Sequence, residues 1–227
     1  MTHTIEKIGG TSIANTEVIL NNVLIKGRKG KDLYGRAFVV SAYAGITDLL
    51  LEHKKTGKPG VYEMFNSGEN KWAWSDALSE VADAMKAKNH EIFGDHPDCG
   101  IADAFVNERI EGARNCLIDL HRLCSYGQFR LDEHLITVRE MLAALGEAHS
   151  AHNTALLLRQ HGVAAVFTDL TGWRDSRELT LDERIMDAFR SIDMSKEMPI
   201  VTGYASCSDG MVKLYDRGYT EVTFSHI

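Results

Sequence analysis

A short, uninterrupted apolar run near the N-terminus constrains the fold of this chain most. Residues 37–42 read AFVVSA and carry no charge. Such a strand suits a parallel sheet that helices cover on both faces, because neither side of it then meets water. Residues 4–8 alternate like a strand, and residues 15–27 carry apolar side chains at helical spacing. The first forty residues therefore predict a β-α-β unit, which is typical of α/β folds.

The remaining chain predicts a long helical insertion and then a return to strands. We expect a helix at 46–56, followed by a helical excursion from the sheet at about 62–145, where strand signals are few. Beyond it, the expected elements are strands at 163–168 and 198–204, a helix with an acidic first turn at 179–192, and a hairpin arm at 211–216. The predicted fold class is α/β, an αβα sandwich with a mainly parallel sheet.

Composition and charge exclude several classes of protein. The 227 residues are 44% hydrophobic and 25% charged, which is typical of a globular protein in water. The net charge is −7 without a block of Lys and Arg, so we expect no nucleic-acid partner. No apolar run is long enough to span a membrane, and the N-terminus lacks signal-peptide features. The cysteines show no zinc spacing, which predicts reduced thiols, a cytoplasmic protein and no metal ligands; they are Cys99, Cys116, Cys124 and Cys207.

The segment KIGGTS, residues 7–12, joins the first strand to the first helix. Its two glycines let backbone N–H groups approach an anion closely, and Lys7 adds a positive charge. Thr11 or Ser12 can cap the helix that follows. The segment is not a Walker A loop, because its lysine precedes the glycines. A phosphate site and an ordinary strand–helix turn are both compatible with so short a motif.

Small and hydroxyl residues also follow the second strand. In VVSAYAGITDLL, residues 39–50, Ser41 and Ala42 end the strand, and Thr47 lies where a helix begins. Ligands of open parallel sheets bind beyond the carboxyl ends of the strands. The two strand ends meet at one edge of the sheet, so we favour a ligand site there over two unrelated turns.

Two later segments carry further candidate groups. Glu147 lies in LGEAHSAH, residues 145–152, within an apolar helical context, although a lone Glu more often faces solvent. His149 and His152 have i,i+3 spacing, but no third ligand follows at zinc-like spacing, so we expect packing or surface histidines. Arg217 precedes a glycine where a helix begins, which suits either bidentate binding of a carboxylate or a surface ion pair.

Together these segments resemble the amino-acid kinase superfamily, and within it the aspartate kinases. That family opens with K-F-G-G-T-S, and its second strand reads V-V-S-A-x-A-G-x-T-[ND]-x-L-L, which VVSAYAGITDLLL matches nearly throughout. Its H-G-E, P-V-[VI]-[TP]-G-[FY] and G-R-G-G-S-D segments resemble LGEAHSAH, MPIVTGYAS and DRGYTEVTFS. The matches keep their order along the whole chain. DRGYTE differs from the common G-R-G-G-S-D segment, and in this respect the chain resembles the divergent aspartate kinases associated with ectoine synthesis.

The resemblance implies phosphoryl transfer from Mg-ATP to the side-chain carboxylate of L-aspartate, which gives 4-phospho-L-aspartate. Lys7 and Gly10 would be catalytic, and Lys7 would contact the transferred phosphate. The implied phosphate cradle comprises Lys7, Gly9, Gly10, Thr11 and Ser12. Glu147 would bind the substrate ammonium and Arg217 its α-carboxylate. Further implied amino-acid contacts are Ser41, Ala42, Thr47, Thr220 and Glu221, of which the last two replace the family's Ser and Asp.

The resemblance also sets expectations for domain organisation. Residues 1–227 would be the N-terminal, amino-acid-binding portion of the kinase domain. The nucleotide-binding remainder and regulatory domains would be absent, so we expect the chain alone to be a poor enzyme. We expect a homo-oligomer with L-aspartate, ATP and Mg²⁺ as its ligands. Two alternatives stay open: a kinase of the glutamate 5-kinase or acetylglutamate kinase type, and a non-catalytic amino-acid-binding relative.

Overall fold

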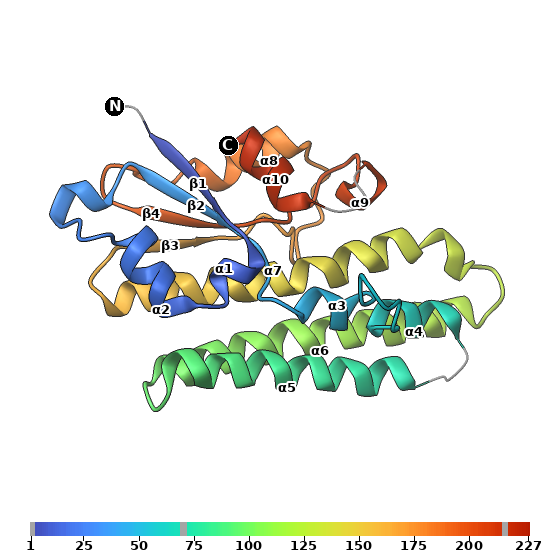
Figure 1. Ribbon diagram of the computed structural model, residues 1–227. Helices are drawn as coiled ribbons and strands as arrows, with labels where there is room; N and C mark the ends of the chain where they lie inside the picture. The colour runs from blue at the N-terminus through green and yellow to red at the C-terminus, as the bar shows by residue number, and fades with distance from the viewer. Residues whose placement is uncertain (1–2, 69–71, 215–217) are drawn as a thin grey trace. The chain divides into compact units, whose positions relative to one another are not determined.

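The computed structural model describes residues 3–68, 72–214 and 218–227. The chain divides into two compact units (Figure 1). The sheet unit comprises Met1–Ala44 and Glu147–Ile227, and the helical unit comprises Gly45–Gly146. Among the described residues, no helix combines the length and the apolar character that crossing a membrane requires.

The sheet unit is built on four parallel strands in the order β1-β2-β4-β3. The strands are β1 (Thr4–Ile8), β2 (Arg36–Val40), β3 (Ala165–Thr168) and β4 (Met198–Thr202). Every residue of β2 and β4, the two central strands, is buried. Burial on both faces explains their continuous apolar sequences. The predicted α/β class and all four predicted strands are confirmed.

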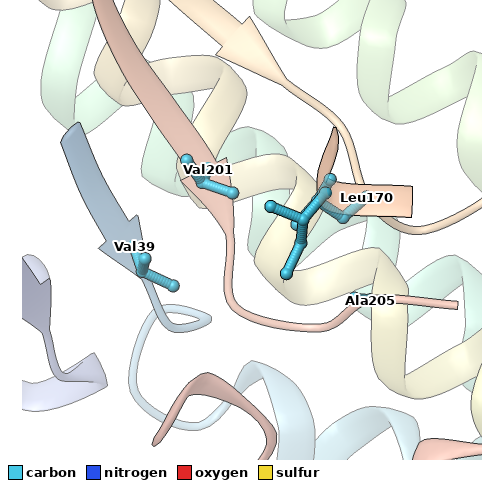
Figure 2. Packing of buried hydrophobic residues seen from close by; sticks show 5 residues of the cluster. Val39, Leu170, Val201 and Ala205 are labelled. Atoms are coloured by element: carbon cyan, nitrogen blue, oxygen red, sulfur yellow. The ribbon is translucent and has the colours of Figure 1, made fainter. Parts of the chain in front are cut away.

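Helices cover both faces of this sheet (Figure 1). On one face, α8 (Leu181–Phe189) and α10 (Tyr219–His226) lie over the strands. Figure 2 shows part of the core on that face, whose buried members are Val39, Leu170, Ile185, Val201 and Ala205. On the other face lies α7 (Leu135–Gln160), whose His152 packs edge-on against Phe167 of β3, with ring centroids 5.5 Å apart.

The segment between β1 and β2 differs from the single helix predicted for 15–27. After α1 (Gly10–Ile13), α2 (Thr16–Ile19) passes directly into the π-helix η1 (Leu20–Leu24). The amide of Ile25 donates to the carbonyl of Leu20 at 2.9 Å, five residues back. The wider π turn buries both ends of η1, Leu20 and Leu24, in the sheet unit. Helical periodicity in the sequence does not reveal this packing. A short 3₁₀-helix, η2 (Gly30–Leu33), precedes β2.

The helical unit confirms the predicted excursion. Its elements are α3 (Ile46–Leu50), α4 (Val61–Ser67), α5 (Ala73–Phe93), α6 (Asp98–Cys124), η3 (Leu131–Glu133) and the start of α7. The helices α5 and α6 form a hairpin joined by a turn at 94–97. Their buried side chains recur at helical spacing, for example Leu78, Val81 and Met85 on α5.

The helix predicted for 46–56 ends early, at Leu50. The chain turns back on itself: Glu52 bridges Pro59, and the amide of Gly60 donates to the carbonyl of Leu51 at 2.9 Å. A Cβ on Gly60 would lie 2.5 Å from the carbonyl oxygen of Leu49. This close approach of two backbone segments requires glycine at position 60.

The hairpin arm predicted for 211–216 is wrong, because Met211–Leu214 form the short helix α9. A four-residue segment is too short for its apolar pattern to separate a strand from a helix. By contrast, α8 falls within the helix predicted at 179–192 and starts with a capping box. There the Thr180 side chain accepts from the Glu183 amide, and the Glu183 side chain accepts from the Thr180 amide.

Candidate active site

Most predicted site residues lie in the sheet unit, around the carboxyl ends of β1 and β2. Those that the structure describes there are Lys7 in β1, Gly9 to Ser12 at the start of α1, Ser41 and Ala42 after β2, Glu147 in α7, and Thr220 and Glu221 in the first turn of α10. Thr47 lies in α3 of the helical unit. Arg217 lies outside the described residues.

Gly10 brings the turns after β1 and β2 into close contact. A Cβ at Gly10 would lie 2.5 Å from the carbonyl oxygen of Ala42, whereas a Cβ at Gly9 would meet nothing within 4 Å. Gly10 is thus required for packing, and Gly9 keeps an open backbone. The capping role predicted for Thr11 or Ser12 is wrong, because α1 begins at Gly10 and its N-cap is Gly9, which has no side-chain cap.

An ion pair between Lys7 and Glu221 joins β1 to α10. The Lys7 ammonium donates a hydrogen bond to Oε1 of Glu221, and this bond lowers the pKa of the Glu221 carboxyl. The side chains are 30% and 59% exposed, so water and ligands reach both. Gly218 precedes α10 with a φ of 91°, a left-handed conformation that favours glycine. The pair therefore positions a cation at the edge of the sheet while leaving it accessible.

A chain of hydroxyl groups links Glu147 to the end of β2. The Thr220 hydroxyl donates to Oε1 of Glu147 at 2.9 Å, and the Ser41 hydroxyl lies 2.8 Å from that of Thr220. Because Thr220 has one hydroxyl proton, Ser41 is the donor in the second bond. Beneath them, the Ser150 hydroxyl lies within bonding distance of the carbonyls of Ser41, at 2.8 Å, and Glu147, at 3.1 Å. The structure thus brings three predicted substrate contacts into one network.

Glu147 is a buried carboxyl group with one oxygen available. The residue is 8% exposed, so the solvated helix face that a lone Glu usually adopts is excluded. Burial raises the pKa of Glu147 to about 8, and hydrogen bonds from Thr220 and the Tyr204 backbone offset this effect only in part. No described residue donates a hydrogen bond to Oε2. A buried carboxyl oxygen of this kind suits a cationic ligand group, which would compensate the charge.

The turn after β4 also contacts the site, although none of its residues was among the predicted site residues. Gly203 donates its amide to the Val40 carbonyl at 3.0 Å, and its own carbonyl accepts from the Thr223 hydroxyl at 2.6 Å. A Cβ on Gly203 would collide with the Thr220 side chain. The sequence did contain a signal for this turn: Gly203 directly follows the apolar strand at 198–202, and ligands of parallel sheets bind beyond the ends of such strands.

The two histidines near Glu147 both pack against aromatic rings. His149 is 1% exposed, packs edge-on against Tyr43 at 5.3 Å, and lies 3.1 Å from the Asn153 side-chain amide through Nε2. His152 packs on Phe167. The expectation of packing histidines is confirmed.

Solved structures with the same fold include two of Escherichia coli aspartokinase III. One is the R-state complex with aspartate and ADP, with a TM-score of 0.57, and the other is the T-state complex with lysine and aspartate, with a TM-score of 0.58. Each is 15% identical in sequence and covers 92% of this chain, and the matches span 42% and 43% of those chains. At this identity the likeness establishes the fold, which is the predicted amino-acid kinase fold.

Sequence comparison extends the likeness to a named relative. Aspartate kinase Ask_Ect of Stutzerimonas stutzeri (strain A1501) is 50% identical over 225 residues, which are 99% of this chain and 47% of the relative. The chain therefore spans about half the length of that relative. The model of the amino acid kinase family matches residues 3–227. With its parallel sheet and the order of its motifs, the chain belongs to the amino acid kinase family.

Proposed function

We propose that this chain is the amino-acid-binding portion of an aspartate kinase. The reaction would transfer a phosphoryl group from Mg-ATP to the side-chain carboxylate of L-aspartate. The 50% identity to a curated aspartate kinase supports this function and the ectoine-associated subgroup. The observation that carries the proposal is the buried Glu147 carboxyl, which has an available oxygen and is linked through Thr220 to Ser41.

The acceptor would bind through its backbone-type groups. Oε2 of Glu147 would pair with the aspartate ammonium, and the hydroxyls of Ser41 and Thr220 would orient polar substrate atoms beside Ala42. Arg217 would hold the α-carboxylate, and Thr47 would add a further contact. These grips leave the side-chain carboxylate free to attack. Such positioning can supply several kcal/mol of a barrier, up to about 7–11 kcal/mol in favourable cases.

The phosphoryl side of the site requires positive charge rather than a base. A free aspartate carboxylate has a pKa near ~3.9 and is already ionised at neutral pH. The difficulty is the approach of two anions, which the Lys7 ammonium and the open backbone around Gly9 would ease. Glu221 would keep Lys7 in place until it contacts the phosphate. Mg²⁺ would supply further positive charge when bound with ATP, and Gly10, Thr11 and Ser12 would line the same cradle.

Two further features belong to this proposal. We expect a homo-oligomer, which light scattering coupled to gel filtration measures directly. We expect a cytoplasmic location, which fractionation of source cells tests.

Calorimetry with the 227-residue chain tests the proposal. L-Aspartate should bind, N-acetyl-L-aspartate should bind at least tenfold more weakly because it lacks the ammonium, and L-glutamate should bind more weakly than aspartate. Formation of aspartyl hydroxamate from aspartate, ATP and hydroxylamine then reports turnover. Binding without turnover fits an amino-acid-binding portion. No aspartate binding, or a preference for glutamate or N-acetyl-L-glutamate, would contradict the function.

A further inference from the structure

A second cluster of ligating side chains lies in the helical unit, where α5 turns into α6. His90 is in the last turn of α5, and Cys99 and Asp103 are four residues apart on α6. One ligand atom from each lies within 4.8 Å of the others. We propose that His90, Cys99 and Asp103 bind a divalent transition-metal ion of the zinc type. The proposal uses no residue of the candidate active site and does not depend on the proposed function.

The distances suit such an ion. Sγ of Cys99 lies 3.4 Å from Nδ1 of His90. A tetrahedral zinc ion, with bonds of about 2.3 Å to sulfur and about 2.0 Å to nitrogen, separates these two ligand atoms by about 3.5 Å. Oδ2 of Asp103 lies 3.6 Å from the other ring nitrogen, Nε2. The His90 side chain is 65% exposed, so its ring can turn and present one nitrogen to an ion shared with Asp103.

The surroundings orient the proposed ligands. Asn89 is fully buried, and its side-chain amide donates to Oδ1 of Asp103 at 2.8 Å, which leaves Oδ2 directed at His90. Partners of this kind commonly orient carboxylate ligands around metals. Binding would replace the thiol proton of Cys99 by the ion, and the proton would leave to water.

The chemistry of the three side chains selects the ion. Thiolate and imidazole favour Zn²⁺ or Co²⁺, whereas Mg²⁺ prefers oxygen ligands alone. Thiolate and carboxylate together also balance the two positive charges. Three protein ligands leave a fourth position for water, which the exposed His90 side allows. The ion would join the end of α5 to the start of α6 across the turn at 94–97. The proposal departs from the expectation of no metal ligands, which rested on spacing along the sequence, whereas His90 lies on a different helix from Cys99 and Asp103.

Cobalt titration of the 227-residue chain, after dialysis against a chelator, tests the site. We expect one Co²⁺ per chain and a thiolate-to-cobalt charge-transfer band in the near ultraviolet, with Zn²⁺ displacing Co²⁺ and millimolar Mg²⁺ failing to do so. Cys99→Ser should abolish the band, and Asp103→Asn and His90→Gln should each weaken binding at least about tenfold. Cys116→Ser is the matched control, since Cys116 is an exposed cysteine of the same helix, and it should keep both band and affinity.

Each other outcome overturns the proposal. Without a thiolate band in the unmodified chain, or with an unchanged band in Cys99→Ser, the three residues form only a hydrogen-bonded contact between helices. Circular dichroism of each variant checks its fold. If Cys99→Ser unfolds, His90→Gln still decides, because that side chain is largely exposed and its loss does not disturb the core.

Discussion

Thr220 and Glu147 share a buried hydrogen bond of 2.9 Å, although 73 residues separate them in the sequence. Through this bond α10 is tied to α7, and Ser41 extends the link to the end of β2. The bond satisfies Oε1 of Glu147 and leaves Oε2 without a donor among the described residues. The network thus holds the carboxyl group in one orientation, with one oxygen that accepts a hydrogen bond from the described residues and one that does not.

Aspartate binding should strengthen as pH rises towards 8. The pKa of Glu147 is raised to about 8, so below that pH the carboxyl is neutral and must lose a proton to pair with an ammonium. Affinity should rise about tenfold per pH unit between pH 6 and 7.5 and level off above 8. Calorimetry across this range measures the slope. Glu147→Gln should bind weakly with no slope, and an unchanged slope in that variant would assign the proton elsewhere.

Removal of the Thr220 hydroxyl should destabilise the sheet unit. Thr220 is 4% exposed, so Thr220→Val leaves the Glu147 oxygen and the Ser41 hydroxyl without their buried partner. We expect a loss of about 1–3 kcal/mol in the free energy of unfolding, measured by urea denaturation. Thr220→Ser keeps the hydroxyl and should keep aspartate binding. Equal aspartate affinity of Thr220→Val and Thr220→Ser would show that the Thr220 hydroxyl does not contribute to binding.

The two glycines after β1 should respond differently to alanine. Gly10→Ala places a methyl group 2.5 Å from the Ala42 carbonyl oxygen and forces the backbone to move, at a cost of about 1–3 kcal/mol in unfolding free energy. Gly9→Ala meets open space at a φ of −75°, so its effect should stay within about 0.5 kcal/mol. Thermal unfolding of both variants gives the comparison. A larger loss for Gly9→Ala would mean that this turn packs differently.

Loss of the Lys7 amine should abolish turnover and spare the fold. The Lys7–Glu221 pair is partly exposed and contributes about 0–1 kcal/mol to stability, so Lys7→Ala should unfold at nearly the same temperature. Hydroxamate formation by an active form of the kinase should fall at least about a hundredfold if Lys7 stabilises the phosphoryl group. Lys29→Ala, at an exposed lysine, is the control. Activity within a few-fold of the unmodified protein would remove Lys7 from the proposed mechanism.

The strands and the helical insertion were predictable because their signals are local. Apolar runs such as residues 37–42, and helical periodicity over dozens of residues, can be recognised in the sequence without knowledge of tertiary contacts. The π-helix η1 and the early end of α3 were not predictable, because η1 depends on packing of its buried ends and the chain after α3 depends on a backbone contact between residues far apart in the sequence. Gly60, for instance, lies so close to the Leu49 carbonyl that a Cβ would not fit, and helical periodicity does not reveal this approach.

The sequence predicted which residues form the candidate site, but not how they contact one another. Motif resemblance named Lys7, Glu147, Thr220 and Glu221, and the structure joins these four into an ion pair and a hydrogen bond. Glu147 becomes buried, and Gly203 comes too close to Thr220 for any side chain, only when α7 and α10 pack on the sheet. Gly203, Tyr204 and Ser150 were missed for the same reason.

The strand order implies a late assembly of the sheet during synthesis. β4 lies between β2 and β3 in the sheet, yet it follows both of them in the chain and leaves the ribosome after them. Until residues 198–202 emerge, β2 and β3 lack their shared partner, whereas the helical unit is one continuous segment that can fold earlier. The nascent chain therefore carries unpaired edges on β2 and β3 until β4 emerges, and such edges promote aggregation of partly folded chains.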